Sequence, residues 1–224
     1  MHTTSLTMQG LIQNLAATDS SLSYIEILRE ECRAALEEAG GTWTRDAVQK
    51  LRLVDSTIRE SLRVSPFIVF GLPRKVIDPQ GIIIDADNSK YHIRSGKIIS
   101  LPIEHTHYDE DLYPEAHQFN IFRFSHTRAE TGSGESGLES STAKPAVTLD
   151  DQFLTFGYGK HGCPGRFFAV HLMKLILAHI LLNYDIQYTK TKPAWRSISW
   201  LKLPVNKTTV QIRRRTKAHY EAGP

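Results

Sequence analysis

The chain has 224 residues, of which 41% are hydrophobic and 23% charged, and its formal net charge at pH 7 is +3. These values are typical of an ordinary globular chain of one or two domains, and they argue against electrostatic binding of nucleic acid. The N-terminus lacks a secretory signal, and we expect no stretch to be long and apolar enough to span a membrane. The two cysteines, Cys32 and Cys163, give no disulfide framework, which suggests a reducing compartment.

Residues 1–18 are expected to form a helix, since Leu6, Leu11 and Leu15 follow one another at helical spacing. No capping residue or approach segment precedes them. We therefore expect the sequence to start partway along a longer helix.

A second helix is predicted over residues 44–65, with the pattern ending at Pro66. Its apolar positions are Leu51, Val54, Ile58 and Leu62. Glu60 and Arg63 share one face of this helix and can form an ion pair, which contributes only about 0.2–0.5 kcal/mol on an exposed helix. The spacing alone does not decide whether this ion pair is exposed or buried.

Two β-rich runs follow, over residues 75–84 and 90–102, with turn signals at Pro79 to Gly81 and at Ser95 to Gly96. They predict a small sheet. The next stretch holds four side chains of metal-binding type, but their spacing implies no fixed ligand geometry, so we predict a polar segment without a metal. These side chains are His105, His107, Asp109 and Glu110.

Residues 125–150 are rich in Ser, Gly, Thr and Glu and contain few aliphatic residues. This composition predicts an exposed, mobile loop without chemistry. The loop precedes the most informative part of the chain.

Residues 156–169, FGYGKHGCPGRFFA, place Cys163 in glycine-rich backbone before a long apolar helix. If Cys163 caps that helix and Pro164 takes its first position, the helix dipole and the following amides favour a thiolate. Glycines at 157, 159, 162 and 165 would let the backbone approach a flat, metal-bearing ring. A structural thiol is the ordinary alternative. A zinc site would need four ligands, and Cys32 lies far away in the sequence.

The helix after Cys163, through residue 182, is apolar on nearly every side, which predicts burial in a large core. Residues 197–215 predict a hairpin whose tip lies around residues 201–206.

The cysteine segment resembles the haem-binding signature of the cytochrome P450 family at Phe156, Gly159, His161, Cys163 and Gly165. The resemblance implies that Cys163 is the axial thiolate ligand of haem iron, that His161 reaches a haem propionate and that Phe156 packs near the sulfur. A thiolate ligand pushes electron density onto the iron and favours O–O cleavage.

The ESLR sequence at residues 60–63 resembles the E-x-x-R motif of the same family. Arg123, in FNIFRF, matches the third member of that motif's buried network. The resemblance implies that Glu60, Arg63 and Arg123 have a structural role beneath the haem.

Further positions are carried over by resemblance. His2-Thr3-Thr4 is similar to the latter half of the family's proton-delivery motif, which gives Thr3 a catalytic role in oxygen activation, although the small residues that should precede it are absent. Arg74 would be a second propionate partner. The expected substrate-facing residues are Phe67, Ile68, Val69, Phe70 and Leu201.

The resemblance covers nearly the whole chain and implies an α+β fold, mainly α with small β-sheets. Residues 1–224 would be the C-terminal, haem-binding half of a single cytochrome P450 domain. The implied function is a haem-thiolate monooxygenase that oxidises an apolar small molecule with O₂ in fungal secondary-metabolite biosynthesis. The alternative is a truncated, inactive fragment or a haem-binding interaction module.

The implied cofactor is haem, with electrons supplied from NADPH through NADPH-cytochrome P450 reductase. The basic surface near Lys160 and Arg166 is the expected reductase contact. A full-length relative would be anchored on the cytosolic face of the endoplasmic reticulum membrane.

Overall fold

The computed structural model describes residues 2–125, 143–189, 191–205 and 209–216. The helices are α1 (His2–Ala16), α2 (Tyr24–Glu38), α3 (Arg45–Lys50), α4 (Arg52–Val64), α5 (Ile103–His107) and α6 (Arg166–Asn183), with the 3₁₀ turns η1 (Ser20–Leu22) and η2 (Gly159–His161). The strands are β1 (Gly71–Lys75), β2 (Ile82–Ala86), β3 (Ser89–Ile93), β4 (Ile98–Leu101), β5 (Tyr184–Ile186), β6 (Trp195–Ile198), β7 (Leu201–Pro204) and β8 (Ile212–Arg214). The predicted α+β class is confirmed.

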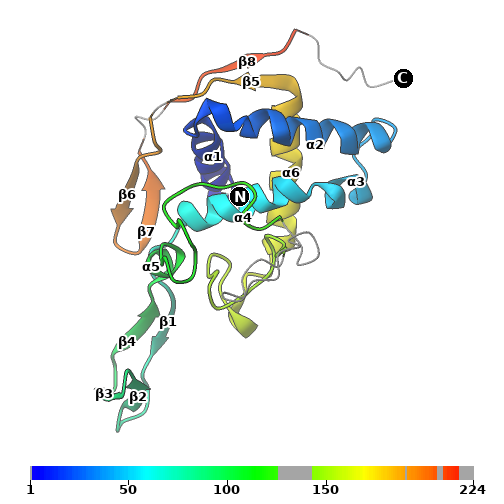
Figure 1. Ribbon diagram of the computed structural model, residues 1–224. Coiled ribbons are helices and arrows are strands. Elements are labelled where there is room, and N and C mark those ends of the chain that lie inside the picture. The colour runs from blue at the N-terminus through cyan, green and yellow to red at the C-terminus, as the bar shows by residue number, and fades with distance from the viewer. Residues whose placement is uncertain (1, 126–142, 190, 206–208, 217–224) are drawn as a thin grey trace, which may run out of the picture.

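The longer helices pack together around one apolar core, while the β1–β4 and β2–β3 pairs extend away from them as an arm (Figure 1). Helix α6 contacts α1, α2, α3 and α4, so it lies at the centre of the helical group. The fully buried side chains of Val54 and Ile58 of α4, and of Leu51 just before it, pack into this core. Their helical spacing is the reason that the sequence predicted an amphipathic helix here.

The helix predicted over residues 44–65 is two helices, α3 and α4, separated at Leu51. Leu51 has a non-helical ψ of 77°. The start of α4 is capped from α2, because the Glu31 carboxylate accepts hydrogen bonds from the amides of Leu53 at 2.7 Å and Val54 at 2.8 Å. A carboxylate at this position accepts hydrogen bonds from amides that have no partner within the helix. Its negative charge is also stabilised by the positive end of the helix dipole.

Helix α6 corrects the expectation that no stretch of the chain could cross a membrane. By length and hydropathy its 18 residues are sufficient to do so. One face of α6, at Val170, Met173 and Leu177, is buried against the other helices. Only 33% of the helix is buried, so the prediction that the whole helix lies in a large core is wrong. Lys174, a charged residue in the middle of α6, pairs with Asp55 of α4 at 2.7 Å.

The β-rich runs form antiparallel two-stranded units, β1 with β4 and β2 with β3. The turn that joins β2 to β3 lies at Asp87 and Asn88, which both have positive φ. Gly81 and Gly96, where turns were predicted, have φ of 77° and 82° and flank the β2–β3 unit. Gly81 cannot readily carry a side chain, since an added Cβ would lie 2.4 Å from the Ile93 carbonyl oxygen.

The C-terminal hairpin is shorter than predicted. Strands β6 and β7 pair with each other, and their turn lies at Ser199 and Trp200, so Leu201 starts a strand and is not at the tip. Strand β8 pairs instead with β5 at the end of α6. The part of the predicted tip at Asn206 lies outside the described residues.

The segment predicted as a mobile loop, 125–150, is described only at Ser125 and from residue 143 onward. Residues 143–150 differ from the prediction, because Ala146 is fully buried and its amide donates to Asp55 of α4 at 2.7 Å. The polar composition of the segment gave no indication of this contact, because a single alanine produces no periodic pattern.

Candidate active site

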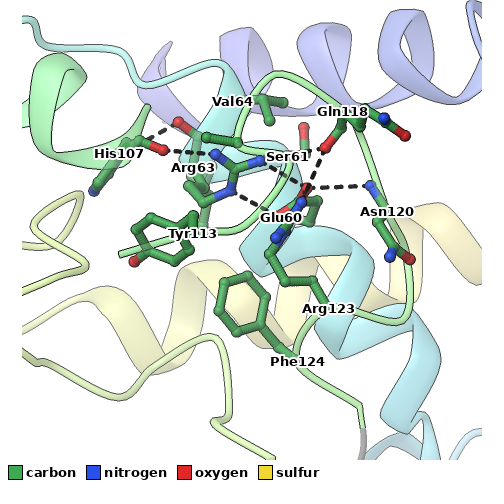
Figure 2. A network of polar contacts seen from close by, with 12 residues as sticks. Glu60, Ser61, Arg63, Val64, His107, Tyr113, Gln118, Asn120, Arg123 and Phe124 are labelled. Atoms are coloured by element: carbon green, nitrogen blue, oxygen red, sulfur yellow. Dashed lines mark hydrogen bonds and ion pairs between the residues drawn. The ribbon is translucent and has the colours of Figure 1, made fainter. Parts of the chain in front are cut away.

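Glu60, Arg63 and Arg123 form one network of ion pairs inside the protein (Figure 2). The Glu60 and Arg63 side chains have no exposed surface. Arg63 contacts the carboxylate with both Nε, at 2.8 Å, and Nη2, at 2.9 Å, and Arg123 Nε lies 3.1 Å from Glu60 Oε1. Of the two alternatives left open by the sequence, the Glu60–Arg63 pair is therefore the buried one.

The two guanidinium groups use their remaining N–H groups to hold the chain between α5 and residue 123. Arg63 Nη1 donates to the His107 carbonyl oxygen at 2.6 Å, and Figure 2 shows Arg63 between Glu60 and His107. Arg123 donates to the Pro114 carbonyl at 2.7 Å and to the Glu115 carbonyl at 3.1 Å. Removing a charge from water costs free energy unless the charge gains an opposite charge and hydrogen bonds. These contacts offset the cost of burying the network.

A second buried ion pair, not found from the sequence, lies beside this network. Arg59, which is 1% exposed, donates to Asp150 Oδ2 at 2.6 Å and to the carbonyls of Pro145 at 2.9 Å and Thr148 at 3.0 Å. Its guanidinium lies 4.0 Å from the centre of the Phe153 ring. Arg59 thus holds the segment that leads to Cys163 against α4. The available signal was a group of three charged residues, Arg59, Glu60 and Arg63, in the last turns of an amphipathic helix.

The Cys163 loop is closed on itself by backbone hydrogen bonds. The Cys163 amide donates to the Phe156 carbonyl at 2.7 Å, and η2 occupies the turn between them. Gly157 and Gly159 take φ of 80° and 55°, in the region that glycine adopts without strain. Cys163 is exposed, so its sulfur is accessible.

Cys163 does not cap α6, contrary to the prediction. The helix begins at Arg166 with Gly165 at its N-cap, and Cys163 and Pro164 belong to the turn before it. The Arg166 amide reaches the Cys163 carbonyl at 3.4 Å, closing that turn. The prediction assumed that the helix started directly at the proline, whereas one further turn precedes it.

Arg166 has a local role that sequence analysis did not assign. Its side chain donates to the Cys163 carbonyl at 2.9 Å and to the Val147 carbonyl at 3.0 Å, and it lies 4.4 Å from the centre of the Phe167 ring. It therefore ties the cysteine turn to the segment before it. These contacts make Arg166 less suited to a reductase contact than Lys160, which is exposed.

The predicted substrate-facing residues come together from two distant parts of the chain. Residues 67–70 run beside β7: Ile68 and Leu201 form a β-bridge, and the Val69 amide donates to the Trp200 carbonyl at 2.9 Å. Phe70 is half exposed. The two segments are therefore adjacent, as residues that contact the same substrate must be.

Three other predicted site residues lie at the surface, whereas Phe156 is half-buried and packs against the core. Thr3 is exposed in the first turn of α1, and its carbonyl accepts the Thr7 hydroxyl at 2.9 Å. Arg74 is exposed on β1 and donates to the Pro73 carbonyl at 2.8 Å. His161 is exposed at the end of η2, two residues before Cys163. In the part of the chain that the structure describes, these hydrogen bonds of Thr3 and Arg74 lie within α1 and β1 and not with the cysteine loop.

Gly157→Ala should destabilise the protein more than Gly159→Ala. Both substitutions place a side chain in left-handed backbone, which costs roughly 1–2 kcal/mol. At Gly157 the added Cβ would also lie 2.8 Å from the His161 carbonyl oxygen, whereas at Gly159 nothing lies within 4 Å. Denaturant unfolding should show an additional loss of about 1 kcal/mol or more for Gly157→Ala. Equal losses would contradict the tight loop described here.

Fold and site together define a helix-rich α+β protein in which buried ion pairs support a loop that presents a thiol. Residues 1–213 match the cytochrome P450 family. The chain is 43% identical to cytochrome P450 monooxygenase okaG of Penicillium ochrochloron, over 95% of this chain and 42% of that protein. It is also 37% identical to gloP of Glarea lozoyensis, over 95% of this chain and 40% of that protein. The chain belongs to the cytochrome P450 family.

A third relative, cytochrome P450 monooxygenase fsoD of Humicola fuscoatra, is 37% identical over 92% of this chain and 38% of that protein. All three relatives are fungal proteins with monooxygenase names. The chain spans about two fifths of their length.

Proposed function

We propose that this chain carries the haem-thiolate part of a monooxygenase that oxidises an apolar small molecule with O₂. The observation that carries the proposal is the accessible thiol of Cys163, held in a closed glycine-rich loop that is tied to a buried ion-pair framework. Family membership and the monooxygenase names of its relatives support the same reaction class.

The residues around Cys163 fit a flat apolar cofactor. A thiolate is a soft ligand suited to iron. Three aromatic side chains within five residues of Cys163 in the sequence are exposed: Tyr158 is 48% exposed, Phe167 57% and Phe168 69%. At Gly165 an added Cβ would find only the Cys163 sulfur within 4 Å, so the backbone on that side is open. Exposed apolar patches of this kind mark a surface that another group covers.

When bound, haem would supply the reductive activation of O₂. Cys163 would hold the iron through its sulfur, and the Phe156–Cys163 backbone hydrogen bond would fix the direction of that ligand. The exposed phenylalanines at the start of α6 would help to exclude water from the bound group. His161 would donate to a propionate, and Thr3 would pass protons from its hydroxyl. Residues 67–70 and Leu201 would orient the substrate.

The proposed substrate is apolar because the two segments at its expected place contribute apolar side chains, chiefly Phe67, Ile68, Val69 and Leu201. We place the reaction in fungal secondary metabolism, with electrons from NADPH through NADPH-cytochrome P450 reductase. The cytosolic face of the endoplasmic reticulum is the proposed location of the whole protein. These finer assignments rest on family membership and on similarity to fungal relatives.

The test is turnover of a panel of terpenoid, alkaloid and polyketide intermediates by the haem-loaded protein with reductase, NADPH and isotopically heavy oxygen gas. The proposal predicts a product that contains one heavy oxygen atom, and Cys163→Ser should abolish it. Haem binding through Cys163 without any oxygenated product would favour the haem-binding interaction module over the monooxygenase.

A further inference from the structure

We propose that His107 is a positioning residue for the Cys163 loop: its imidazole bridges the end of α4 and the segment that leads into the loop. The proposal rests on the proposed function only where it concerns haem ligation. The contacts of His107 itself are independent of any cofactor.

His107 is the last residue of α5 and is fully buried. Its Nδ1 lies 3.2 Å from the Arg63 carbonyl oxygen, and its Nε2 lies 3.0 Å from the Leu154 amide nitrogen. A carbonyl oxygen can only accept and an amide N–H can only donate, so Nδ1 carries the proton and Nε2 is the acceptor. Only the neutral ring can make both bonds.

Burial, with Arg63 and Arg59 nearby, lowers the pKa of His107 from 6.5 to about 3, which agrees with a neutral ring. The ring also stacks on Phe153, with 5.4 Å between ring centres and 13° between planes. The imidazole therefore contacts two consecutive residues of the same segment, through its face and through Nε2.

A series of backbone hydrogen bonds continues from this contact to the cysteine. The Leu154 carbonyl accepts the Gly157 amide at 2.9 Å, and the Phe156 carbonyl accepts the Cys163 amide at 2.7 Å. Leu154 is itself buried, so its amide needs the acceptor that His107 provides. The position of the cysteine turn thus depends on where residue 154 is held.

Other contacts pin the same segment to α4, which shows that the segment has a fixed register on that helix. Thr155 donates through its hydroxyl to the Leu62 carbonyl at 3.2 Å. Arg59 binds Asp150, four residues before Leu154. His107 differs from both because it supplies the acceptor for a main-chain amide at the point where the loop begins.

Three substitutions separate this role from general support of the fold. His107→Phe retains a ring that can stack on Phe153 and removes both hydrogen bonds. His107→Gln retains an oxygen near the position of Nε2 and can accept from Leu154. Tyr108→Phe is the matched control, because the Tyr108 hydroxyl donates to the Val64 carbonyl at the same end of α4 but does not contact the 150–156 segment.

Amide hydrogen exchange on the haem-free protein is the first readout, followed by mass spectrometry of peptides that span residues 150–163. His107→Phe should speed exchange there by about tenfold or more, relative to Tyr108→Phe, with most of the protection restored by His107→Gln. After haem loading, the reduced carbon monoxide spectrum of His107→Phe should lose thiolate-ligated signal that Tyr108→Phe retains.

Equal exchange in the His107→Phe and Tyr108→Phe proteins would overturn the proposal. Should His107→Phe fail to fold, His107→Asn replaces it, because asparagine reaches the Arg63 carbonyl but not Leu154; protection equal to that of His107→Gln would again overturn it. A wild-type protein without any thiolate signal would defeat the proposed function alone, since the exchange comparison still decides the role of His107.

Discussion

Glu60→Ala is expected to lower the free energy of unfolding by about 3–5 kcal/mol, because it leaves the Arg63 and Arg123 charges without their carboxylate. Arg63 is fully buried and can reach no solvent to replace the lost partner. The backbone amide of Asn120, which donates to Glu60 at 3.1 Å, would lose its acceptor in the same change. Urea unfolding followed by circular dichroism measures the loss.

Glu30→Ala is the matched control. Glu30 also pairs with an arginine three residues away on a helix, at 2.5 Å, but both side chains are exposed. Water replaces such a partner at little cost, so this variant should unfold almost as the wild type does. If Glu60→Ala were equally mild, the network would not be the buried framework that the structure shows.

Acidification should destabilise the protein through His107. The pKa of His107 is about 3 in the folded protein and near 6.5 in the unfolded chain, so the unfolded chain binds the extra proton as the pH falls below 6.5. The contribution of the neutral ring is complete above pH 6.5 and is lost as the pH falls toward 3. The slope should be about 1.4 kcal/mol for each pH unit in that window.

His107→Gln isolates this effect from carboxylates that titrate in acid, since glutamine has no charge to gain. Between pH 7 and pH 5 the wild type should lose about 2 kcal/mol more than His107→Gln in urea unfolding. Asp150, which faces His107 and opposes the shift, is present in both proteins. Parallel losses in the two proteins would show that His107 is not held neutral in the folded state.

Local periodicity predicted α1, most of α4 and α6, because a buried helix face repeats along the chain. The α4 pattern at Val54 and Ile58 and the apolar α6 helix are examples. The E-x-x-R spacing gave Glu60 and Arg63 as a possible pair, and resemblance to the family added Arg123. The structure brings these three together, which spacing alone could not decide.

What the sequence did not reveal depends on contacts between distant residues. The Glu31 carboxylate starts α4 from another helix, so the break at Leu51 has no local signal. The partners of His107 are Arg63 and Leu154, each more than forty residues away. In the sequence, His107 is one of several polar residues in a row, and nothing there indicates that it is buried.

The cysteine turn was misjudged for a different reason. Proline commonly takes the first helical position, and this preference suggested that Cys163 caps α6. One more turn instead precedes the helix, with Gly165 at the N-cap, and the Arg166 side chain binds the Cys163 carbonyl.

The most direct test of the account is the carbon monoxide difference spectrum of the haem-loaded, dithionite-reduced protein, with Cys163→Ser beside it. We predict a strongly red-shifted Soret band in the wild type that is absent in Cys163→Ser, since only the thiolate gives that shift. A wild-type protein without the band, or a band that survives in Cys163→Ser, would contradict the assignment of Cys163 as the haem ligand.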